Sequence, residues 1–137
     1  MKRNMKKMTV LLLVCGILFG TMSVSAASQS FVYVFSSKNQ LRDTASYAKE
    51  DSEQNAYVTN YKEGLSNFDA GVDVWGCRVR KTSNDNAMTN YTLIKNLTTY
   101  RLPYTSTGYA GTTYFLRAQI DSSSPYSSLT VQGRWLP

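Results

Sequence analysis

Apolar and polar residues alternate with a period of two along much of this chain. The most regular segments are residues 72–81, 112–120 and 128–136. Successive side chains of a β-strand point to opposite faces, so each segment is expected to form a strand with one apolar face. In the first of them, Trp75, Cys77 and Val79 share one side. Gly76 lies inside the same segment, where a glycine often marks a β-bulge.

Several less regular segments are also rich in β-branched and aromatic residues. They are residues 31–35, 54–61, 90–97 and 98–104. Residues 31–35 are apolar on both faces, which predicts a strand covered on both sides. Residues 43–53 have a mixed pattern that fits a loop, a short edge strand or a single helical turn. Six or seven short strands with frequent turn signals predict one all-β domain, an antiparallel β-sandwich or a barrel-like fold.

The first 26 residues differ in composition from the rest of the chain. Four basic residues precede the apolar run 10–19, and small residues follow near position 26. This order is typical of a secretory signal peptide. We expect cleavage before Ala27 or Ser28, which leaves residues 27–137 as a single secreted, extracellular β domain. The apolar run has about half of the roughly 20 residues that a bilayer core requires, so no membrane span is expected in the mature form.

Removing that leader changes the charge of the protein. The whole chain has 15 Lys and Arg, of which four lie in the leader, so 11 remain against nine Asp and Glu. A net charge of +2 does not favour nucleic-acid binding, which usually requires a strongly basic domain. The densest basic cluster, residues 78–81, is more simply interpreted as a solvated strand.

The two cysteines raise separate questions. Cys15 lies in the leader and would carry a lipid anchor in a lipoprotein, but Val14 stands where such signals usually have a small residue. Cys77 is then the single cysteine of the exported domain, so no disulfide within the chain is expected. Cys77 either links two chains or is buried, and its phase with Trp75 and Val79 favours burial.

The residue types argue against catalysis. The chain has no histidine, which excludes Ser-His-Asp and Cys-His sites and removes the commonest transition-metal ligand. Carboxylates between residues 50 and 73 supply candidates for a glycosidase pair, but their spacing fixes no opposed pair. Residues 50–53 and 84–86 offer oxygen ligands for calcium without the spacing of a known calcium loop, and turn chemistry explains them equally well. We therefore expect a non-enzymatic protein with no metal and no cofactor.

A contact surface is the remaining functional candidate. In the predicted alternation, five side chains with large aromatic or cationic groups point away from the core. They are Tyr57, Tyr61, Arg78, Arg80 and Arg117. Tyrosine and arginine are enriched at the centres of binding surfaces, which makes these residues the candidate binding site.

Four short segments have a familiar sequence. They are residues 42–49 (RDTASYAK), 100–104 (YRLPY), 114–118 (YFLRA) and 131–137 (VQGRWLP). With these segments, the chain resembles a family of small secreted proteins of unknown function from Gram-positive bacteria. More distantly, it is similar to the lactococcin 972 type of bacteriocin, whose members are exported, poor in cysteine, rich in aromatic residues and end near a tryptophan. The first resemblance implies export and a β fold, and the second implies action on the cell wall of competing bacteria.

Two functions follow as hypotheses. The first is a secreted interaction module that contacts a cell-wall component or an extracellular protein. The alternative is a bacteriocin-like antimicrobial protein that acts on the cell envelope of competing bacteria.

Overall fold

The structure is a computed structural model that describes residues 27–137, and the predicted signal peptide lies outside this range. The described part contains nine strands and no helix. The strands are β1 (Gln29–Phe35), β2 (Arg42–Asp43), β3 (Tyr47–Ala48), β4 (Asn55–Tyr61), β5 (Trp75–Lys81), β6 (Thr92–Ile94), β7 (Thr99–Pro103), β8 (Thr113–Ile120) and β9 (Leu129–Leu136). Among these residues, no helix is long and apolar enough to cross a membrane.

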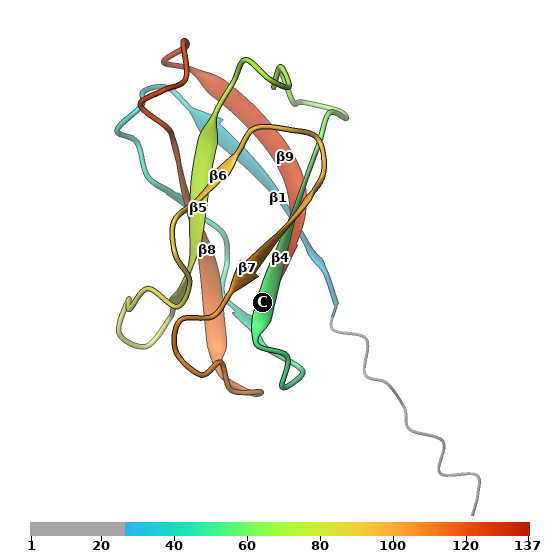
Figure 1. Cartoon of the computed structure of the whole chain (residues 1–137), viewed down its shortest axis with the longest axis vertical. Coiled ribbons are helices and arrows are strands. Elements are labelled where there is room, and N and C mark those ends of the chain that lie inside the picture. The colour runs from blue at the N-terminus through green and yellow to red at the C-terminus, as the bar shows by residue number, and fades with distance from the viewer. Residues whose placement is uncertain (1–26) are drawn as a thin grey trace, which may run out of the picture.

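The strands form two antiparallel sheets that pack face to face. One sheet has the order β1, β9, β4, β7, and the other has the order β2, β8, β5, β6, with β3 also paired to β8. In Figure 1, β5, β6 and β8 lie to the left of β1, β4 and β9. The chain is therefore an all-β sandwich, as the strand pattern predicts.

The core lies between the sheets and is built by the alternating apolar positions. Trp75, Cys77 and Val79 of β5 are completely buried, and the inward residues of β8 and β9 pack with them. Trp75 contacts the rings of Phe31 and Tyr33 edge to face, with ring centroids 5.9 and 6.1 Å apart. Cys77 is a buried free thiol. This confirms the burial predicted from its alternation in phase with Trp75 and Val79. Burial raises the pKa of this thiol far above its usual value.

A buried hydrogen bond joins the two sheets through this core. The hydroxyl of Tyr33 in β1 donates to the backbone carbonyl of Leu116 in β8, at 2.7 Å. The same carbonyl accepts the backbone N–H of Thr44 at 3.0 Å. The phenol therefore fills the space between the sheets without leaving its polar atom unpaired.

The strand count is higher than the six or seven predicted, because the segment after β1 contributes two very short strands. Both β2 and β3 have two residues and pair with β8. Of the three interpretations left open for residues 43–53, the short edge strand is confirmed by β3. Strands of two residues carry almost no periodicity, so the pattern alone does not reveal them.

The prediction that β1 is covered on both faces is wrong. Val32 and Val34 are 46% and 53% exposed, whereas Phe31, Tyr33 and Phe35 are buried. A two-sheet sandwich covers only the inner face of each sheet, and β1 lies at an edge of its sheet.

The bulge suggested by Gly76 is also absent. The β5 register runs without interruption, with Trp75 opposite Ile120 and Cys77 opposite Ala118. The glycine serves another purpose, because a Cβ at position 76 would lie only 2.0 Å from Cζ of Tyr91. Gly76 therefore leaves room for the Tyr91 ring on the outer face of β5.

Candidate functional site

Three of the five predicted contact residues meet on the outer face of the five-stranded sheet. Arg78 and Arg80 come from β5 and Arg117 comes from β8. Arg117 stands directly opposite Arg78 on one side and directly opposite Asp43 of β2 on the other. Strand pairing thus lines up a carboxylate and two guanidinium groups across three strands. We call the surface formed by Arg78, Arg80 and Arg117 the arginine face.

Arg117 is held by two carboxylates. Its Nε and Nη2 donate to the two oxygens of Asp43, both at 2.8 Å, and its Nη1 donates to Asp85 at 3.1 Å. The fork-shaped contact with Asp43 is the favoured geometry between arginine and a carboxylate. These bonds, first of all those to Asp43, raise the pKa of Arg117 above its usual value.

Arg80 is held by the loop that follows β5. Its Nε donates to the Asp85 carboxylate at 2.6 Å, and its Nη2 donates to the Asp85 backbone carbonyl. Asp85 has a positive φ of 56°, a conformation that Asp and Asn tolerate better than most residues. Hydrogen bonds from Arg80, and then from Arg117, lower the pKa of the Asp85 carboxyl. One turn residue therefore fixes two arginine side chains.

Arg78 differs from its two neighbours. Within residues 27–137, no carboxylate lies within ion-pair distance of Arg78, and its guanidinium makes no hydrogen bond. Its guanidinium carbon lies 5.4 Å from the centre of the Tyr91 ring. Arg117 lies over Phe115 in the same manner, at 5.2 Å. Aromatic rings thus support two guanidinium groups, and of these two, Arg78 is the one whose donors have no partner among residues 27–137.

The three arginines line a pocket of about 230 Å³. The rest of its lining comes from Leu41, Tyr91, Ala118 and Gln119. The Tyr91 ring is partly enclosed by its position over Gly76, and burial raises the pKa of its hydroxyl to about 12, while the nearby Gln119 amide acts in the opposite direction. We call this cavity the arginine pocket.

The two predicted tyrosines lie on the other side of the molecule. Tyr57 and Tyr61 belong to β4, in the four-stranded sheet, and both are half-buried on its outer face. The five candidate residues therefore form two groups on opposite faces of the sandwich. Each sheet of a sandwich has its own outer face, so residues that point away from the core lie on opposite sides of the molecule when their strands belong to different sheets.

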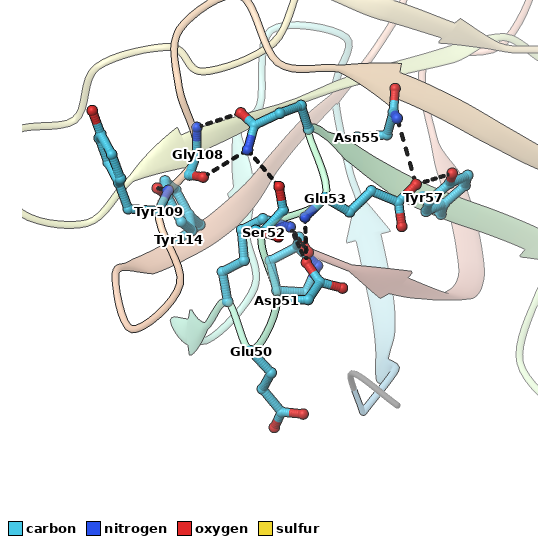
Figure 2. Close-up of polar contacts among 12 residues, drawn as sticks. Glu50, Asp51, Ser52, Glu53, Asn55, Tyr57, Gly108, Tyr109 and Tyr114 are labelled. Atoms are coloured by element: carbon cyan, nitrogen blue, oxygen red, sulfur yellow. Dashed lines mark hydrogen bonds and ion pairs between the residues drawn. The ribbon is translucent and has the colours of Figure 1, made fainter. Parts of the chain in front are cut away.

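Tyr57 is engaged by the acidic loop before β4. Figure 2 shows Tyr57 and Asn55 both directed at the carboxylate of Glu53. The hydrogen bond to Glu53 is the main cause that raises the pKa of Tyr57. Tyr61 lines a separate shallow groove with Glu63 and Arg134. Neither hydroxyl points toward the arginine pocket.

The acidic residues 50–53 have structural partners. Asp51 accepts hydrogen bonds from the side-chain ammonium of Lys49, at 2.7 Å, and from the backbone N–H of Glu53, a contact region shown in Figure 2. Lys49 itself is almost completely buried and lies 5.3 Å from the centre of the Tyr104 ring. In the part of the chain from residue 27 onward, no three acidic or cysteine side chains are placed to share a metal ion.

Sequence reasoning missed four residues of this site. Asp43 and Asp85 orient the arginines, while Tyr91 and Gln119 line the pocket. Gln119 could have been found, since it alternates in phase with Arg117 along β8. The others lie in loops or short strands without periodicity, and their contacts depend on strand pairing.

Comparisons of the chain with protein-family models, with curated proteins and with solved structures find no match.

Proposed function

We propose that this protein is a secreted, non-enzymatic interaction module that contacts a component of the cell envelope, and that the arginine face is its contact surface. The observation that carries this proposal is Arg78, whose guanidinium has no hydrogen-bond or ion-pair partner among residues 27–137 and lines a pocket beside two arginines that do have such partners. A binding surface needs a donor that is available and neighbours that keep it oriented.

The charge of a bacterial wall agrees with such a surface. Gram-positive walls carry phosphate and carboxylate groups, and guanidinium groups recognise both. The surface also has an apolar component, because Leu41 beside the pocket is 53% exposed. Exposed apolar and aromatic groups around a cation are common at the centres of interfaces.

Four of the carboxylates are engaged by neighbouring side chains, which supports a non-enzymatic role. Asp43 and Asp85 are bound by arginines, Asp51 by a buried lysine and Glu53 by a tyrosine. A glycosidase needs two opposed carboxyl groups directed at an open cleft. Here these groups are used to hold loops and side chains in place.

Sedimentation with isolated Gram-positive cell wall tests the proposal. Exported protein should pellet with the wall, Arg78→Gln should pellet much less, and added salt should weaken the binding because the contacts are ionic. Arg101→Gln is the matched control, since Arg101 is an exposed arginine on β7 in the opposite sheet. No pelleting, or equal loss in both variants, would overturn the proposal.

A growth assay on a panel of indicator bacteria, performed with the same proteins, decides between the two hypotheses. Wall binding without growth inhibition supports the interaction module. Wall binding with inhibition that also requires Arg78 would replace it with the bacteriocin-like antimicrobial protein.

A further inference from the structure

We infer that the arginine pocket is an oxyanion subsite, in which Arg78 binds one phosphate or carboxylate group of the wall polymer through two parallel N–H donors. This inference rests on the proposed function and names the chemical group that the contact surface takes.

The donors of the Arg78 guanidinium suit an oxyanion. A guanidinium has five N–H groups in a planar fork, which matches the spacing of two oxygens on a phosphate or carboxylate. The described part of the protein uses none of those of Arg78. Arg78 is also half-buried and packed against Tyr91, so part of its hydration is already lost before a ligand arrives. An anion would restore those hydrogen bonds.

The charge of the pocket also favours an anion. Arg78, Arg80 and Arg117 bring three positive charges, and Asp43 and Asp85 neutralise two of them. One positive charge remains, and it lies on Arg78. Because Arg78 is directly opposite Arg117 in the strand register, the two like charges raise the local potential, and a single bound anion relieves their repulsion.

The side chains around Arg78 are preorganised. The carboxylate fork of Asp43 fixes Arg117, and Asp85 fixes Arg80, before any ligand is present. Gly76 allows the Tyr91 ring to lie against the strand, where the Arg78 guanidinium lies over it. A site whose side chains are already ordered loses less conformational entropy on binding.

The size of the pocket suits a small anion. The pocket volume is about 230 Å³, several times the roughly 30 Å³ that one water molecule occupies in the liquid. A tetrahedral phosphate or a carboxylate fits with the first atoms of its attached chain, which would lie between Leu41 and Tyr91. The Gln119 amide offers a further polar contact to the same group.

Titration with inorganic phosphate, and separately with acetate, followed by two-dimensional NMR of the exported protein, tests the subsite. Saturable shifts are expected at Arg78, Tyr91 and Gln119. Arg78→Gln should weaken phosphate binding by about tenfold or more, as expected for hydrogen bonds to a charged group. Arg101→Gln should bind as the unmodified protein does. Shifts that do not saturate, or that persist in Arg78→Gln, would overturn the inference.

Arg78→Lys separates fork geometry from charge alone. Lysine keeps the positive charge but presents a point donor, so phosphate affinity should fall several-fold. Equal affinity in Arg78→Lys would contradict the two-donor contact. Dispersed NMR spectra of each variant establish that a loss of binding does not reflect unfolding.

The wall experiment distinguishes this inference from the proposed function. Wall stripped of its phosphodiester polymers by hydrofluoric acid should lose binding if the ligand is a phosphate, and amidated wall should lose binding if it is a carboxylate. Wall binding that requires Arg78 but survives both treatments would overturn the oxyanion subsite and leave the envelope module standing. Phosphate binding at Arg78 without any wall binding would overturn the envelope module and leave the oxyanion subsite standing.

Discussion

Arg78 and Arg117 face each other on neighbouring strands, where two like charges would ordinarily destabilise the pairing. The protein compensates only on one side of this pair, through the contacts of Asp43 and Asp85 with Arg117. The aromatic rings of Tyr91 and Phe115 lie under the two guanidinium groups. At the scale of single residues, the described part of the chain therefore orders the surroundings of Arg78 and contributes no partner to the donors of Arg78 itself.

The hydroxyl of Tyr91 provides a titration that reports on this packing. Burial raises its pKa from 10.0 to about 12, so the folded state favours the neutral phenol. Because the pKa is higher in the folded state, this contribution to stability is complete below pH 10 and is lost as the pH rises from 10 to about 12. Alkaline titration followed by the absorbance at 295 nm measures this ionisation. The unmodified protein should show a titration step near pH 12 that Tyr91→Phe lacks. A missing step near pH 10, with the far-ultraviolet circular dichroism unchanged, would contradict the enclosed position of Tyr91.

At the scale of strands, two glycines are required for contacts of different kinds. Gly133 of β9 lies where β1, β9 and β4 meet, opposite both Phe31 and Asn60. A Cβ there would lie 2.2 Å from the backbone carbonyl oxygen of Thr59 and 2.6 Å from the Phe31 ring. At Gly76, the nearest atoms belong instead to the far end of the Tyr91 side chain, which can rotate away.

This difference predicts different outcomes for the two alanine substitutions. Gly133→Ala should lower the free energy of unfolding by about 1–3 kcal/mol, because the backbone of two strands must shift. Gly76→Ala should cost less stability but displace Tyr91 and weaken phosphate binding. Urea denaturation measures the first effect, and the NMR titration measures the second. Equal stability losses, with phosphate affinity unchanged in Gly76→Ala, would show that Tyr91 does not depend on Gly76.

At the scale of the whole molecule, the sandwich depends on contacts between its two sheets. Most of these are apolar, and the aromatic cluster of Phe31, Tyr33 and Trp75 spans the gap. The hydrogen bond from Tyr33 to the Leu116 carbonyl adds a directional link between sheets. Such a bond fixes how one sheet is placed on the other, which apolar contacts alone specify less sharply.

Tyr33→Phe tests that link. Removing the buried hydroxyl should lower the free energy of unfolding by about 1 kcal/mol, since the Leu116 carbonyl still accepts the Thr44 N–H. Tyr61→Phe is the matched control, because the Tyr61 hydroxyl makes only a long, partly buried contact at 3.5 Å, and its removal should change stability little. Urea denaturation of the two variants measures the difference. Equal effects of the two substitutions would show that the bond between the sheets is not specially stabilising.

The sequence alone determined the class of the fold and the inner face of the long strands. In residues 72–81, 112–120 and 128–136 the alternation predicts the buried side chains, because a strand has only two faces and one must exclude water. The same reasoning predicts that Cys77 is buried and that Arg78, Arg80 and Arg117 point away from the core, as the structure shows.

Only the tertiary structure decided how these outward residues are grouped. Alternation states which side of a strand a residue occupies but not which sheet the strand joins, so Tyr57 and Tyr61 were predicted together with arginines that lie on the opposite sheet. It also carries no information on strand order, which brings Asp43, Arg117 and Arg78 into one row. Local spacing fixes the face of each strand, whereas the pairing of segments distant in sequence creates the arginine pocket, in which Arg78 has no carboxylate partner from the described part of the chain.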